Sequence, residues 1–146
     1  MDAHFDGTIF GQLEQLKVCT CETEWLDLLM RLLKAAPKLR FIVLELSKIH
    51  GIRTEDPLMC WNKPSRVPEC LLSSVEYLDW RQYQGTEEEK QVARYILGNS
   101  GRLGFATFYP KSKNPVKNLQ LLTELSMSPK RSSICQLVFR GNYNPA

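Results

Sequence analysis

The sequence predicts an α/β protein with a parallel sheet of about five strands and helices on one face of that sheet. Five segments share an apolar spacing of i, i+3 and i+5, and helical patterns or helix-capping residues lie between most of them. Strands that alternate with helices join into a parallel sheet through right-handed crossovers. The spaced residues are Leu13/Leu16/Val18, Leu39/Ile42/Leu44, Val75/Leu78/Trp80, Leu103/Ala106/Phe108 and Ile134/Leu137/Phe139.

This spacing is the L-x-x-L-x-L pattern typical of leucine-rich repeats, in which each unit supplies a strand and a helix. The five segments begin between 26 and 36 residues apart. One such unit cannot bury its apolar face alone, so neighbouring units stack and build the core together. We therefore expect a leucine-rich-repeat-like parallel sheet, with strands at 13–19, 39–46, 75–81, 103–109 and 134–139.

Three helices are expected between these strands. The first covers about 23–36, where apolar residues recur on one helical face. The second opens at Thr86, which forms a T-x-x-E capping box with Glu89. The third follows Asn114, an N-cap residue with proline after it. The segment 47–69 carries no periodic pattern and reads as a long connector or an insertion with a role.

Composition limits the possible functions. The net charge of +3 is small and spread along the chain, so we expect no nucleic acid and no membrane as a partner. No apolar run is long enough to span a bilayer, and the first residues lack the pattern of a secretory signal. The five cysteines are odd in number, which favours free thiols in a reducing compartment. These features predict an intracellular protein, cytoplasmic or nuclear.

No residues have the types and spacing of a catalytic, cofactor or metal site. The only histidines, His4 and His50, have no nucleophile or metal partner in their surroundings. The cysteines are spaced C-x-C and C-x9-C, unlike the two close pairs of a zinc finger. The acidic run 87–89 suits a helix N-terminus. The basic turn 128–133 suits a connector, with a phosphate contact or phosphorylation as the alternative. We expect no enzyme, no cofactor and no metal.

The repeat spacing predicts which side chains face away from the helices. If positions i+3 and i+5 point toward the helices, positions i+2, i+4 and i+6 point to the other face of the sheet. Several of those residues are aromatic or charged, as in the anchors of protein-binding surfaces. The alternative is that the 47–69 segment or further repeats cover this face. The candidate protein-binding residues are Phe41, Tyr77, Asp79, Arg81, Phe105 and Tyr109.

Three stretches together resemble a known plant family. PECLLSSVEYL, EEEKQVARYIL and SPKRSSICQLVF closely resemble the FBD domain, which follows leucine-rich repeats at the C-terminus of many plant F-box proteins. The preceding residues resemble the last repeat and its connector. The resemblance implies a flexible lead-in at 1–12, a repeat-like segment with connector at 13–63, an FBD domain at 64–140 packed as one unit with it, and a tail at 141–146.

The resemblance also implies a role. In the family, an F-box binds a Skp-type protein of a cullin ubiquitin ligase and the repeat region recruits the substrate. No stretch of this sequence resembles an F-box, so a Skp-type adaptor is not an expected partner. We expect a non-enzymatic protein-interaction module with an unknown protein target. The alternatives are a small-molecule receptor fragment with a pocket near Arg81, Tyr83 and Tyr109, or a truncated gene product without retained function.

Overall fold

A single parallel sheet organises the molecule. The computed structural model describes residues 11–20, 24–46 and 66–141. Five strands lie in the sheet in chain order, and every neighbouring pair is parallel. They are β1 (Gln15–Cys19), β2 (Phe41–Glu45), β3 (Tyr77–Tyr83), β4 (Phe105–Pro110) and β5 (Gln136–Phe139). The predicted α/β fold with a five-stranded parallel sheet is confirmed.

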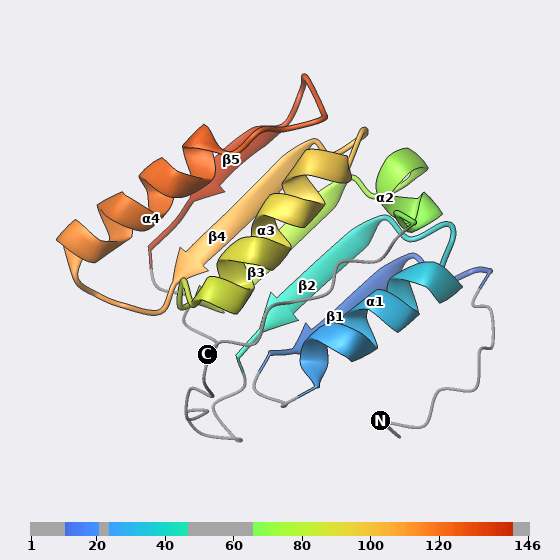
Figure 1. Cartoon of the computed structure of the whole chain (residues 1–146), viewed down its shortest axis with the longest axis horizontal. Helices are drawn as coiled ribbons and strands as arrows, with labels where there is room; N and C mark the ends of the chain where they lie inside the picture. Colours follow the sequence, from blue (N-terminus) through green and yellow to red (C-terminus); the bar gives the residue numbers. More distant parts are fainter. Residues whose placement is uncertain (1–10, 21–23, 47–65, 142–146) are drawn as a thin grey trace.

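Four helices pack on one face of this sheet (Figure 1). Their bounds are α1 (Trp25–Ala35), α2 (Glu69–Ser73), α3 (Glu87–Asn99) and α4 (Pro115–Met127). Three of them lie where the apolar pattern and the capping residues predict. The sequence prediction missed α2, because five residues are too few to show a helical period. The predicted connector over 47–69 lies outside the described residues except for its last four positions.

Each strand begins about two residues later than the repeat pattern predicts. The reason is that the first apolar residue of three repeats packs into the turn before its strand. Leu39, Val75 and Leu103 are completely buried there. Ile134 holds the same repeat position before β5 but is exposed.

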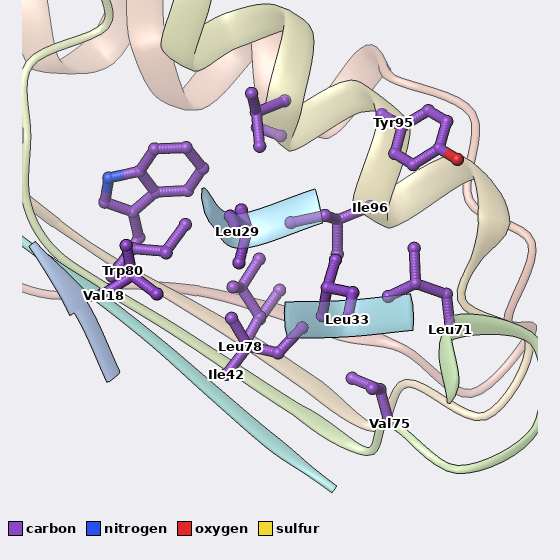
Figure 2. Packing of buried hydrophobic residues seen from close by; sticks show 14 of the residues in the cluster. Val18, Leu29, Leu33, Ile42, Leu71, Val75, Leu78, Trp80, Tyr95 and Ile96 are labelled. Carbon is purple, nitrogen blue, oxygen red and sulfur yellow. The ribbon is translucent and has the colours of Figure 1, made fainter. Parts of the chain in front are cut away.

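The core lies between the sheet and the helices. Alternate strand residues point toward helix residues, as Ile42, Leu78 and Trp80 do toward Leu29 and the other side chains shown in Figure 2. This orientation confirms that positions i+3 and i+5 face the helices. In β5, the equivalent Leu137 and Phe139 pack against the same core but are only partly buried. Burying large side chains of this kind stabilises a fold by about 1.5–3 kcal/mol each.

Two tryptophans join the N-terminal half of the core to its middle. Trp25 of α1 packs edge-on against Trp80 of β3, with 6.1 Å between ring centroids. Its indole N–H also donates a 2.9 Å hydrogen bond to Glu88 of α3. Because α2 is a single short turn, α1 and α3 make this contact across a separation of 63 positions in the chain.

The helix caps follow the sequence prediction. At α3, the Glu89 N–H donates to the Thr86 hydroxyl at 3.2 Å, and the Thr86 N–H donates to the Glu89 carboxylate at 3.1 Å. The Gln84 N–H donates to the same carboxylate oxygen at 3.1 Å. At α4, the Asn114 side chain accepts from the backbone at the helix start. These caps satisfy N–H groups that would otherwise lack partners.

The cysteines depart in part from the sequence prediction. Cys70 and Cys135 are free thiols, and the Cys70 thiol donates to the Leu33 carbonyl at 3.3 Å. Burial raises the pKa of Cys70 to about 12, so this thiol is held in its unreactive protonated form. Cys19 is disulfide-bonded, which corrects the expectation of a free thiol at this position. It lies at the end of β1 and is partly buried.

The candidate binding face of the sheet

The face of the sheet that points away from the helices carries side chains in rows. Because the parallel strands are in register, residues two apart along one strand lie beside the equivalent residues of the next. We call this surface the open-side face. It contains all six residues that the sequence predicts as candidate protein-binding residues: Phe41, Tyr77, Asp79, Arg81, Phe105 and Tyr109.

An aromatic row crosses three strands of the open-side face. Phe41, Tyr77 and Phe105 are aligned by the strand register. The first two ring centroids are 4.8 Å apart with planes 7° from parallel, and the next pair is 5.9 Å apart at 5°. The rings therefore turn their faces toward one another rather than outward. Phe105 is 41% exposed, so the row presents apolar surface to solvent at β4.

Arg40 borders the aromatic row at the start of β2. Its guanidinium lies 5.4 Å from the centroid of the Phe41 ring, within cation–π range. It also pairs with Glu76 at 3.3 Å and with Glu14 at 3.4 Å. The hydrogen bond and charge of Glu76, followed by those of Glu14, raise the pKa of Arg40. Sequence reasoning missed Arg40, because alternation in the predicted strand 39–46 puts it on the same side as Ile42 and Leu44, toward the helices.

A chain of ion pairs runs across the open-side face beyond the aromatic row. Lys17 contacts Glu45 at 3.1 Å, Glu45 contacts Arg81 at 3.5 Å, and Arg81 contacts Asp79 at 3.0 Å. Each contact joins side chains of opposite charge, so the row is close to neutral. Tyr109 lies beside Arg81 in the register between β3 and β4 and is partly exposed.

In this row of ion pairs, Asp79 has the most constrained carboxyl group. Partial burial raises the pKa of its carboxyl group, and the charge of Arg81 opposes that shift. One oxygen, Oδ2, accepts from the Arg81 guanidinium at 3.0 Å. The other, Oδ1, is buried and has no hydrogen-bond partner in the described part of the chain. A buried carboxylate oxygen without a donor is unfavourable, so this position gains from any donor that reaches it.

Tyr83 is not where the pocket hypothesis places it. A bulge between Arg81 and Tyr83 breaks the alternation of β3, and Gln82 takes a positive φ of 58° there. The bulge turns Tyr83 into the core, where it is 1% exposed. Its ring packs edge-on against Trp80 and Phe108, each at 5.1 Å between centroids. The side chains of Tyr83 and Arg81 therefore point to opposite sides of the sheet.

The basic turn between α4 and β5 is a structural connector. The Lys130 ammonium donates to the carbonyl oxygens of Ser126 and Ser128, both at 3.2 Å, at the end of α4. Ser132 is buried and accepts from the Ile134 N–H at 3.3 Å. A positive charge at the C-terminal end of a helix also interacts favourably with the helix dipole. Lys130 is therefore used in capping the helix.

The residues that the structure describes lack two features, a membrane-spanning helix and a metal-ligand cluster. No helix there is long and apolar enough to cross a membrane. Within the same ranges, no three histidine, cysteine, aspartate or glutamate side chains gather as metal ligands would. The open-side face is thus a surface of aromatic and paired charged side chains, carried on the rigid backbone of the sheet.

Comparison with known proteins shows two kinds of similarity. Residues 63–108 match the FBD family model. A probable FBD-associated F-box protein of Arabidopsis thaliana is 49% identical over 138 residues, which are 94% of this chain and 32% of the relative. An F-box/FBD/LRR-repeat protein of the same plant is 42% identical over 134 residues, 91% of this chain and 31% of the relative.

The chain thus spans about a third of the length of these relatives. No solved structure matches the chain. The predicted domain limits, 13–63 and 64–140, stay a prediction. The predicted resemblance itself is confirmed: residues 63–108 are similar to the FBD family model, and nine-tenths of the chain is similar to FBD-associated F-box proteins of Arabidopsis thaliana.

Proposed function

We propose that this chain is a non-enzymatic protein-interaction module whose open-side face binds a protein target. The observation that supports this proposal is the aromatic row, which ends at the 41% exposed Phe105. Aromatic and arginine side chains contribute most of the binding energy in protein interfaces. Here they stand on three neighbouring strands, which hold them in place before a partner arrives and so lower the entropy cost of binding.

The chemistry of the face fits a protein better than a nucleic acid. The rings stack on one another, so their faces are not available as platforms for bases. Each described basic residue of the ion-pair chain has an acidic partner, which leaves no positive stripe for phosphates. A mixed polar and apolar partner surface suits such a face, with a donor placed to reach Asp79.

The names of the relatives support a role related to that of F-box proteins. Proteins named for an F-box and an FBD domain share 49% and 42% identity with this chain. We propose that the chain corresponds to a target-recruiting region, and that its 146 residues do not by themselves bind a Skp-type adaptor. Co-purification of a Skp-type protein with these residues alone would contradict the second statement.

The experiment that tests the open-side face compares two matched alanine substitutions. Proximity labelling in plant cells, with the 146-residue chain as bait, identifies neighbours of the wild-type protein. Phe105→Ala is expected to reduce labelling of a direct target by at least about tenfold, since aromatic anchors of interfaces contribute about 2 kcal/mol or more. Leu72→Ala is the control, because Leu72 has the same 40% exposure but lies on α2, on the helix side.

The result separates the functions that the sequence leaves open. Loss of the same neighbours in both variants, or in neither, would contradict binding at the open-side face. The small-molecule alternative requires Tyr83 at a pocket, and its place in the core gives that hypothesis no support. A gene product without function would give labelling no different from an unrelated bait of the same size.

A further inference from the structure

The C-terminal end of the stack exposes far more apolar surface than the rest of the described chain. Val116, Leu119 and Met127 of α4 are 63–78% exposed, and Ile134 before β5 is 68% exposed. Only Leu121 and Leu125 of α4 are buried. Of the equivalent residues that another unit follows, Leu39, Val75 and Leu103 are completely buried and Leu13 is partly buried. The α4–β5 unit therefore has the surface of a repeat that still needs a neighbour.

The backbone of β5 has an unpaired edge on the same side. The N–H groups of Gln136 and Arg140 donate to β4 carbonyls at 2.8 and 3.0 Å. Alternate strand residues point their backbone groups to opposite edges, so Leu137 and Phe139 direct theirs away from β4. β5 is the last strand of the sheet, and no described strand pairs with that edge.

Exposed strand edges usually carry devices that prevent pairing, such as lysine, proline or a bulge. The opposite edge strand, β1, has Lys17 on its surface and ends at the disulfide-bonded Cys19. The β5 sequence QLVF has no charge, no proline and no bulge among its described pairings. The two edges of the sheet therefore differ, and only β5 is suited to accept another strand.

A second β5 strand matches this edge. If two β5 strands run antiparallel about a two-fold axis at Val138, Leu137 lies opposite Phe139 of the other copy. The N–H and C=O groups of Leu137 and Phe139 that point away from β4 then form both hydrogen bonds of each Leu137–Phe139 pair. The same register places Val138 against Val138 and the single charged residue, Arg140, against Gln136. No like charges meet, and the apolar pairs are of the kind that stabilises neighbouring strands.

The helix beside this edge supports the same arrangement. Lys90 of α3 binds Glu124 of α4 at 2.9 Å, which identifies the flank of α4 that faces α3. At 100° per residue, Leu119 and Leu122 lie on the opposite flank, toward the β5 end. In the two-fold arrangement, α4 of one copy runs antiparallel to α4 of the other, and these leucines face each other.

We propose that the chain forms a homodimer through the β5 edge, with the two sheets joined into one across an antiparallel β5–β5 pair and the two α4 helices packed above it. This proposal is independent of the target-binding function, because the interface lies at the end of the stack and leaves the aromatic row uncovered. It assigns a role to the exposed Leu119 of α4, which target binding does not use.

Sedimentation velocity of the 146-residue chain over a wide concentration range tests the proposal. We expect a concentration-dependent shift from monomer to dimer. Val138→Lys places two ammonium groups opposite each other at the axis and is expected to weaken the dimer at least about tenfold. Thr107→Lys is the matched control, because Thr107 pairs with Val138 in register on the same face but belongs to an interior strand.

Amide hydrogen exchange gives a second readout that needs no variant. In the proposed dimer, the N–H groups of Leu137 and Phe139 become protected as concentration rises. Leu119→Glu, at an exposed position, is expected to weaken the dimer as well. A monomer at every soluble concentration overturns the proposal. So does a dimer that Val138→Lys weakens no more than Thr107→Lys, or one without concentration-dependent protection of Leu137 and Phe139.

Discussion

The first and last helices of the stack pack against the same sheet in different ways. α1 buries six side chains, among them Trp25, Leu29 and Leu33, and makes a hydrogen bond to α3. α4 buries two and leaves Val116, Leu119 and Met127 exposed. Both helices have good local signals in the sequence. The difference shows that in a stack of repeats, local helix formation and contribution to the core are separate properties.

Removing an anchor of α1 should have the largest effect on stability. Trp25→Ala deletes a buried indole that packs on Trp80 and donates to Glu88. We expect the free energy of unfolding to fall by about 3–5 kcal/mol, as for other buried tryptophans. Urea unfolding followed by circular dichroism measures it. A loss below about 1 kcal/mol would contradict the contrast between α1 and α4.

The turn that supports α4 should make stability depend on pH. Burial raises the pKa of Glu89 to about 7, against the backbone N–H groups that favour its ionised form. The folded protein therefore binds a proton that the unfolded chain releases, since an ordinary glutamate has a pKa near 4.5. The contribution to stability is full below about pH 4.5 and is lost as pH rises through 7.

This loss should reach roughly 2–3 kcal/mol between pH 4.5 and pH 8. Urea midpoints across that range measure it. Glu89→Gln, which cannot ionise, is expected to flatten this part of the profile. An equal slope in the wild type and the variant would show that other groups cause it.

Gly85 sets the position of α4 on the sheet. Its φ is +75°, and a methyl group at this residue would overlap the side chain of Leu121 in α4. Gly85→Ala is expected to cost about 1–3 kcal/mol, from backbone strain and displaced packing. Thermal unfolding measures the cost. In the double variant Gly85→Ala/Leu121→Ala, the cost from displaced packing should be recovered and the cost from backbone strain should remain. The comparison therefore separates packing from strain.

The exposed face of α4 should tolerate truncation. Leu119→Ala removes a side chain that is 63% exposed, so the monomer should change in stability by no more than about 0.5 kcal/mol. Leu29→Ala in α1 is the comparison, with an expected loss of about 2–5 kcal/mol. Measurements at low concentration keep dimer formation from adding to the result. Similar losses at both positions would remove the distinction between the two helices.

Much of the fold can be predicted from the sequence, because one repeated spacing determines both the strands and the faces of the sheet. The capping box at Thr86 and the N-cap at Asn114 lie where predicted. The bulge at Gln82 could not be predicted, because it reverses the alternation at Tyr83 without any glycine or proline to signal it. The exposure of Ile134 depends on its place in the last described unit of the stack. The spacing of apolar residues is the same in every unit and so cannot predict that exposure.

The candidate site was predictable in its residues but not in its geometry. Alternation places Phe41, Tyr77 and Phe105 on one face, and the structure adds that their rings stack. The pairing of Lys17 with Glu45, and of Glu45 with Arg81, depends on neighbouring strands in exact register. Whether these residues bind a protein target stays a prediction.

The hydrogen bond between Trp25 and Glu88 has a consequence for how the molecule comes apart. In an ideal stack, each unit touches only its neighbours, and units can detach one at a time from either end. Here the first unit is also tied to the third, so it cannot leave without disturbing α3. The last unit has no equivalent second attachment among the described helices. Under mechanical force or partial denaturation, this protein should therefore open in one direction, from its C-terminal end.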